Sequence, residues 1–153
     1  GPTVWGAMGE HLDKINVTQN LMEFRDRGGQ FPALTMQGQA VFRWAVGDMS
    51  KVAQKALEVA GITADQLDAF IPHQANMRIT DALIKAIKLP GHVPVARDIE
   101  FTGNTSAASI PLAMERMLTS GEIPGGGTAL MIGFGAGLVY ASQVATLPPV
   151  PAD

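Results

Sequence analysis

The sequence predicts an α/β layered fold with a mixed sheet, on the strength of three observations. Apolar residues recur at helical spacing in three long segments. Short apolar runs bounded by glycine or proline are typical of strands, and they lie between those helical segments. The resulting order, β–α–β–α–α–β–β, is that of helices packed on the faces of a sheet.

The first thirty residues carry the weakest pattern. GPTVWG at the start is typical of the end of a strand, and DRGG at 26–29 is typical of a turn. The run FPALTM at 31–36 is short and apolar, and Pro32 restricts it to the start or the edge of a strand.

A long amphipathic helix is predicted from Gln37 to Ala60, because its apolar residues share one face and Gly61 ends the pattern. These residues are Val41, Trp44, Ala45, Met49, Val52, Ala53, Ala56 and Val59.

The central part of the chain predicts a strand between two helical segments. Thr63 and Gln66 match a capping box for a single helical turn. LDAFI at 67–71 is a buried strand ended by Pro72. Asn76 can cap the helix that follows, and that helix stops before Pro90.

The C-terminal part predicts a loop, a helix and two strands. Residues 91–104 are a loop with some extended character, and 106–118 form a helix ended by Gly121. Residues 128–147 form two strands around the turn GFGAG. GFGAG superficially resembles a dinucleotide fingerprint, but the segment after it is a strand and offers no helix N-terminus for a pyrophosphate.

Composition excludes several classes of protein. A formal net charge of −3 argues against a general nucleic-acid binder. The absence of cysteine excludes disulfides, thiolate metal sites and a cysteine nucleophile from this chain. No apolar run approaches the roughly 20 residues that span a bilayer, so we expect a cytoplasmic protein without a membrane partner.

Two side chains stand out at junctions between an apolar segment and a helix. His73 follows the strand at 67–71, where ligands gather in α/β folds, although a structural histidine is the simpler interpretation. Asn104 could bind a ligand or simply cap the next helix, and Thr105, Ser106 and Ser109 could be cap hydroxyls. A metal site is not predicted, because the other histidines lack ligand spacing.

Three motifs in order give these residues a family context. HQANMRI at 73–79, GNTSAAS at 103–109 and GFGAG at 133–137 resemble the thiolase-fold condensing enzymes, in particular β-ketoacyl-acyl carrier protein synthase III. The resemblance implies one βαβαβαββ half of a five-layered α-β-α-β-α fold. Residues 1–30 are then expected to be a remnant of the N-terminal half with a linker, 31–148 the C-terminal domain, and 149–153 a tail.

The resemblance also implies an activity, namely decarboxylative Claisen condensation of an acyl-CoA with malonyl-acyl carrier protein, without a cofactor. His73 and Asn104 match the family's catalytic histidine and asparagine, which donate hydrogen bonds to the enolate oxygen. Phe134 and the backbone N–H of Ala136 match its glycine-rich loop. Leu34, Met36, Gly38 and Asn76 match substrate-binding positions, and Arg43, Arg78 and Lys85 match those that meet the carrier protein.

The expected partners are an N-terminal half that carries the catalytic cysteine, the acyl carrier protein and a second copy of the complete enzyme. Two alternatives stay open. The chain could belong to a relative that loads starters for polyketides or other secondary products. It could also be a non-catalytic half that binds CoA or a carrier protein.

Overall fold

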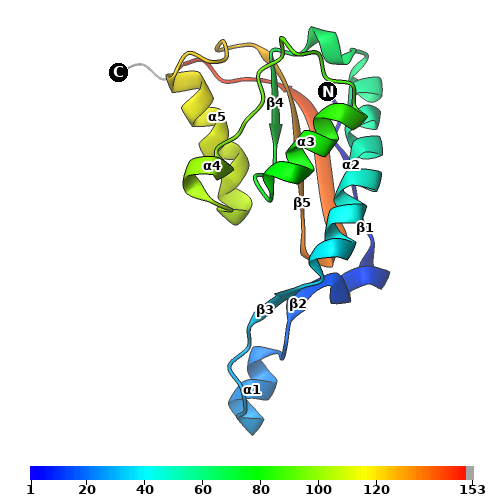
Figure 1. The fold of residues 1–153 in the computed structure, drawn as a ribbon, viewed down its shortest axis with the longest axis vertical. Coiled ribbons are helices and arrows are strands. Elements are labelled where there is room, and N and C mark those ends of the chain that lie inside the picture. Colours follow the sequence, from blue (N-terminus) through cyan, green and yellow to red (C-terminus); the bar gives the residue numbers. More distant parts are fainter. Residues whose placement is uncertain (151–153) are drawn as a thin grey trace.

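The computed structural model describes residues 1–150, which form a mixed four-stranded sheet with helices on both faces and a protruding arm (Figure 1). The strands lie in the order β1-β6-β5-β4. Their bounds are Val4–Ala7 for β1, Ala69–Pro72 for β4, Thr128–Gly135 for β5 and Val139–Thr146 for β6. The predicted α/β fold with a mixed sheet is therefore confirmed.

The sheet is mixed because β4 and β5 are parallel, whereas β6 is antiparallel to both β5 and β1. Val95 adds an isolated parallel bridge to Phe70 at the β4 edge. This bridge accounts for the extended character predicted within 91–104. Residues 4–7 complete the sheet beside β6, in agreement with a strand at the start of the chain, and the expected domain boundaries at 30/31 and 148/149 stay a prediction.

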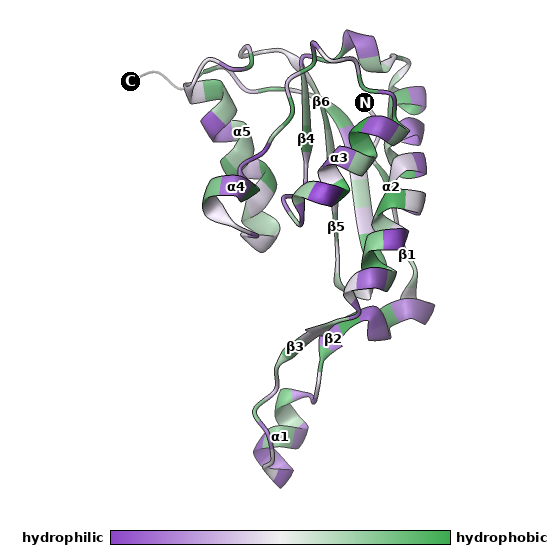
Figure 2. Cartoon of the chain, viewed as in Figure 1, coloured by the Kyte–Doolittle hydropathy of each residue, from purple (hydrophilic) through white to green (hydrophobic). Residues whose placement is uncertain are grey.

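Two apolar layers enclose the sheet. Phe70 and Leu130 pack with α2 (Gly38–Ala60) and α3 (Met77–Ala86), whereas Ala69, Ile71 and Ala129 pack with α5 (Ser109–Thr119) on the opposite face. Alternation of side chains along β4 and β5 produces both layers. Figure 2 shows the hydrophilic residues concentrated on the helices rather than on the central strands.

The predicted helices begin and end at the capping residues that the sequence indicates. Gly61 ends α2 in the left-handed region with φ of 71°, and the capping box of Thr63 with Gln66 is present. The Asn76 side chain accepts a hydrogen bond from the Arg78 N–H and so caps α3. Gly121, with φ of 73°, follows α5 as predicted.

The arm is the part of the fold that the sequence predicts least well. β2 (Ile15–Val17) pairs with β3 (Leu34–Met36) in a separate two-stranded sheet, with α1 (Leu21–Arg27) at its tip. The strand at 31–36 is therefore shorter than predicted and outside the main sheet. All three residues of β3 are exposed, because no helix within residues 1–150 covers these strands.

The remaining segments are short. The sequence pattern does not separately predict the 3-10 segments Gly9–Lys14, Ser106–Ala108 and Ala136–Leu138 or the single helical turn α4 (Ile99–Thr102). The predicted tail at 149–153 lies partly outside the described residues, since the description ends at residue 150. Among residues 1–150, no helix combines the length and the apolar character needed to cross a bilayer.

Candidate active site

A cavity of about 1180 Å³ lies where the arm meets the ends of β4 and β5. The start of α2, the β4–α3 junction, the segment 104–110 and the β5–β6 turn form its walls. The structure brings ten of the eleven predicted site residues into this one cavity: Leu34, Met36, Gly38, Arg43, His73, Asn76, Arg78, Asn104, Phe134 and Ala136. Lys85 does not line it and is exposed in the last turn of α3.

His73 enters the cavity directly after β4. Its backbone N–H donates to the Ile132 carbonyl at 2.7 Å, which extends the β4–β5 pairing by one residue and fixes the imidazole at the strand end. The ring is half-buried and stands edge-on to Phe134, with the centroids 5.3 Å apart. Burial lowers the pKa of the His73 imidazole, because the charged form loses solvation.

The two ring nitrogens of His73 have different surroundings. Nδ1 lies 2.6 Å from the Ser109 hydroxyl, at the start of α5. Within residues 1–150, Nε2 has no hydrogen-bond partner, so it is the nitrogen that can serve a ligand in the cavity. The interpretations as a structural histidine and as a functional one are thus compatible, one for each nitrogen.

The oxygen and the nitrogen of the Asn104 carboxamide also have different surroundings. The Oδ1 atom accepts a hydrogen bond from the Ser106 N–H at 2.8 Å, which closes a local turn and does not cap the helix that follows, as one interpretation of the sequence expected. The side-chain amide makes no hydrogen bond to any described residue. Its N–H groups can therefore donate into the cavity, and the residue is exposed enough for a ligand to reach them.

Phe134 and Ala136 belong to the hairpin between β5 and β6. The predicted tight turn is confirmed, and Gly137 with φ of 71° allows it. The backbone N–H of Ala136 lies outside both strands, so the ladder does not use it. Phe134 also packs edge-on against Trp44 of α2, with the centroids 5.8 Å apart.

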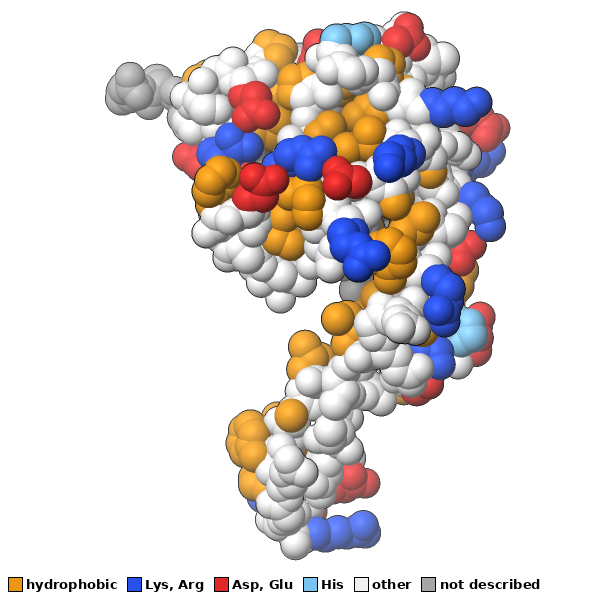
Figure 3. Space-filling model, viewed as in Figure 1, with side chains coloured by type: hydrophobic (Ala, Val, Ile, Leu, Met, Phe, Trp, Pro, Cys, Tyr) orange, Lys and Arg blue, Asp and Glu red, His pale blue; other side chains and the backbone are white. Residues whose placement is uncertain are grey.

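The mouth of the cavity is cationic. Arg78 places its guanidinium 5.4 Å from the centre of the Phe42 ring and so joins α3 to α2 there. Arg43 lines the same region, and no described residue that lines the cavity is acidic. Figure 3 shows Lys and Arg side chains over the α2 and α3 part of this face. The arrangement favours a ligand with negative charge.

The arm contributes the apolar part of the wall. Leu34 and Met36, both mostly exposed, line the cavity from β3, and Gly38 lines it from the first turn of α2. An apolar wall together with a few polar groups is typical of a small-molecule binding site.

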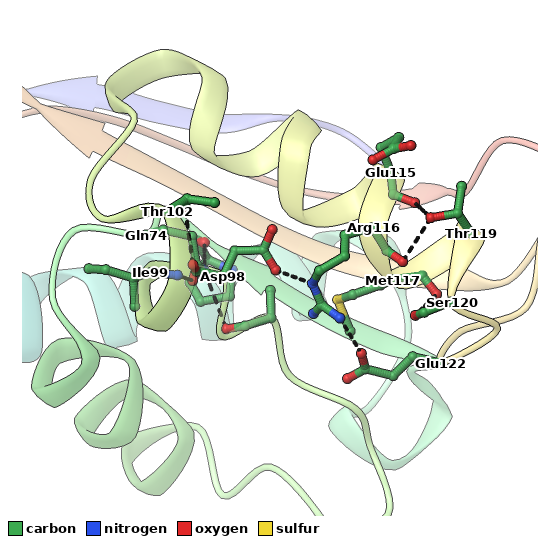
Figure 4. Close-up of polar contacts among 12 residues, drawn as sticks. Gln74, Asp98, Ile99, Thr102, Glu115, Arg116, Met117, Thr119, Ser120 and Glu122 are labelled. Carbon is green, nitrogen blue, oxygen red and sulfur yellow. Dashed lines mark hydrogen bonds and ion pairs between the residues drawn. The ribbon is translucent and has the colours of Figure 1, made fainter.

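A buried polar network supports the loops that carry His73 and Asn104 (Figure 4). Gln74 is fully buried; its Nε2 donates to the Pro72 and Ala96 carbonyls, and its Oε1 accepts from the Ile99 N–H. Asp98, also buried, pairs with Arg116 of α5. These contacts tie the β4–α3 junction to α4 and α5, and hence to the loop of Asn104.

Two contributors were missed by sequence reasoning. The sequence pattern suggests Ser109 as a possible cap, but its hydroxyl contacts His73 and accepts from the Gln74 N–H at 3.3 Å. Thr105 and Ser106 make no side-chain cap either. Gln74 was not singled out at all. The one signal in the sequence is adjacency, because Gln74 follows His73 and Ser109 comes five residues after Asn104.

Residues 57–147 match the family model described as 3-oxoacyl-[acyl-carrier-protein (ACP)] synthase III C terminal. The chain is 60% identical over 149 residues to the β-ketoacyl-[acyl-carrier-protein] synthase III of Streptomyces glaucescens, covering 97% of this chain and 45% of that protein. A mycobacterial synthase III from Mycobacterium avium is 51% identical over 150 residues, with 97% and 45% covered. The chain thus spans about half the length of the curated relatives it matches.

Solved structures give the same picture. The priming β-ketosynthase of a polyketide biosynthetic pathway superposes with a TM-score of 0.93 at 51% identity, over 99% of this chain and 46% of that one. The synthase III of Pseudomonas aeruginosa superposes with a TM-score of 0.85 at 33% identity, over 98% and 44%. The predicted thiolase-like fold, with this chain as about half of it, is confirmed.

Proposed function

Because the chain belongs to the 3-oxoacyl-[acyl-carrier-protein] synthase III C-terminal family, we propose that it supplies the histidine–asparagine half of a condensing active site. The complete protein would join an acyl group from acyl-CoA to malonyl-acyl carrier protein and release CO₂. This reaction starts fatty-acid chains in type II systems, and it makes the complete protein an acyltransferase.

One observation carries the proposal. His73 and Asn104 line the same cavity; Nδ1 of His73 contacts the Ser109 hydroxyl, and Oδ1 of Asn104 accepts from the Ser106 N–H. Within residues 1–150, the Asn104 amide N–H groups and His73 Nε2 remain for a ligand, and Nε2 is a donor in the tautomer that carries the proton there. Two converging neutral donors suit an oxygen that gains negative charge during a reaction.

Decarboxylation creates such an oxygen. When the malonyl thioester loses CO₂, the electron pair of the broken bond becomes an enolate, whose charge falls on the thioester oxygen. Donation from His73 Nε2 and from the Asn104 amide would stabilise that charge. The enolate carbon then attacks the acyl carbonyl, the enzyme thiolate leaves, and the β-ketoacyl thioester stays on the carrier protein. No step requires a metal or an organic cofactor.

The thiol must come from outside this chain, which has no cysteine. We assign it to an N-terminal half that packs against the exposed part of the sheet. Trp5 of β1 and Val139 of β6 are 73% and 50% exposed there, beside a second hollow of about 610 Å³. The Ala136 N–H would then complete, with the cysteine N–H, the oxyanion hole of the acylation step, while Phe134 packs beside the thiol.

The substrates would approach across the cationic mouth. Leu34, Met36, Gly38 and Asn76 would line the path of the acyl chain and the pantetheine arm. Arg43 and Arg78, with Lys85 further along α3, would meet the acidic carrier protein. A homodimer of the complete enzyme and a cytoplasmic location are part of the same proposal.

A second candidate is priming of a polyketide pathway by the same chemistry. It is favoured by the likeness to the priming β-ketosynthase, at 51% identity and a TM-score of 0.93. The two candidates share the site and differ in the acyl-CoA and in the carrier protein that the complete protein prefers.

The test is an assay of the complete protein with acetyl-CoA or a branched acyl-CoA, together with malonyl-carrier proteins of fatty-acid and of polyketide type. Formation of the β-ketoacyl-carrier protein supports the proposal, and the preferred carrier decides between the pathways. Binding of both substrates without condensation would instead favour a non-catalytic binding half.

A further inference from the structure

We propose that Ser109 is a positioning residue that holds His73 in the tautomer with the proton on Nε2. The inference rests on the proposed function for its purpose, because this tautomer is the one that can donate to an enolate oxygen. Its evidence is separate from that function and lies in the hydrogen bonds around one buried hydroxyl.

The direction of the bond between Ser109 and His73 follows from the third group involved. The Gln74 N–H can only donate, so it uses a lone pair of the Ser109 oxygen, at 3.3 Å. The hydroxyl proton then needs an acceptor. Within residues 1–150, the only acceptor bonded to this hydroxyl is Nδ1 of His73, at 2.6 Å.

The opposite arrangement is disfavoured. If Nδ1 carried the proton, the Ser109 oxygen would accept from both His73 and Gln74, and its own proton would have no partner. Ser109 is only 2% exposed, so water could not easily take that role. An unpaired buried donor is costly, whereas donation from Ser109 to Nδ1 satisfies all three groups.

The hydroxyl is held firmly enough to impose this choice. Ser109 begins α5 and does not cap it, so its side chain is not shared with the helix backbone. Gln74 is fixed by hydrogen bonds to Pro72, Ala96 and Ile99. The backbone N–H that orients Ser109 therefore belongs to a turn with little freedom.

The chemical nature of the group that contacts His73 Nδ1 also affects the charge of the ring. A carboxylate at Nδ1 would stabilise the imidazolium ion and suit a general base. A serine hydroxyl carries no charge, and the charged residues that line the cavity are the cations Arg43 and Arg78. The surroundings of His73 thus favour a neutral ring that donates from Nε2.

The test reads the tautomer directly, by nitrogen NMR of ring-labelled histidine in the complete protein, without substrate, at about pH 8, where histidine is neutral. His73→Gln identifies the signal. The wild type is expected to show a protonated Nε2 and a bare Nδ1. Ser109→Ala should move the proton to Nδ1 in a substantial fraction of molecules, and Ser109→Thr, which keeps the hydroxyl, should restore the wild-type signal.

Ser120→Ala is the matched control, because it removes a hydroxyl at the other end of α5 and should leave the signal unchanged. The proposal is overturned if the wild type carries the proton on Nδ1, or if Ser109→Ala leaves it wholly on Nε2. Since the readout needs no turnover, a wild type that fails to condense would defeat the proposed function and leave this result standing.

Discussion

The ring of Phe134 meets the imidazole of His73 edge-on, with the two centroids 5.3 Å apart. Trp44 packs on Phe134 in the same manner. This aromatic wall keeps water from one side of the histidine, and desolvation lowers the pKa of His73. None of the described residues that line the cavity is acidic, so none of them offsets the effect.

His73 should stay neutral as the pH falls through about 6.5, the ordinary value for histidine. NMR titration of its ring in the complete protein should give a midpoint below that value. Phe134→Ala should raise the midpoint toward the ordinary value, because water then reaches the ring. A midpoint at or above the ordinary value in the wild type would contradict the account.

The same shift has a consequence for stability. Between the lowered pKa of the folded state and the ordinary pKa of the unfolded state, the unfolded chain binds more protons. The free energy of unfolding should therefore fall as the pH drops through this window. Thermal unfolding of the wild type and of His73→Gln at several pH values should show this loss of stability in the wild type and not in the variant. The same dependence of stability on pH in both proteins would argue against a lowered pKa of His73.

Charge at the cavity mouth should govern docking of the carrier protein. Arg78→Glu should raise KM for malonyl-carrier protein several-fold and weaken its salt dependence, because it removes an attraction at the rim. KM for malonyl-CoA should change less, since the acidic protein is absent.

Lys55→Glu is the matched control, because Lys55 is an exposed cation of α2 that does not line the cavity. Equal effects of the two reversals on malonyl-carrier protein would show that only net charge matters, against a docking surface at the mouth.

The pair of Asp98 with Arg116 should support the fold near the site. The Asp98 side chain is 5% exposed, so the change Asp98→Asn removes the negative charge from a buried ion pair with Arg116. This change should lower the free energy of unfolding by about 1–3 kcal/mol. Glu58→Gln, which breaks the exposed pair with Lys55, should cost under about 0.5 kcal/mol. Denaturant unfolding of the complete protein measures both, and equal losses would contradict the structural role.

The sequence predicts the layered core well, for a physical reason. In α2, β4 and β5 the hydrophobic period, the caps and the turns agree, so local pattern and final packing coincide. The site's outline follows from the same logic, because His73 and Asn104 stand at junctions that this packing brings to one cavity.

Where the sequence fails, the deciding contacts are not local. The arm has short strands with exposed apolar residues such as Leu34. Because neither face of these strands is buried, their sequence shows no alternation of apolar and polar residues that would predict the pairing. The role of Ser109 depends on a contact with His73 across 36 residues, and a serine at a helix start has a simpler local explanation. Distant polar pairing of this kind emerges only from the folded geometry.

In the proposed mechanism, Asn104 donates to the enolate and has no part in the acylation step. The most direct measurement is on Asn104→Ala in the complete protein, with cysteine acylation by acyl-CoA followed by mass spectrometry and condensation followed separately. The account predicts normal acylation and a loss of condensation of about 10²–10³-fold. Condensation at the wild-type rate, or an equal loss in both steps, would contradict it.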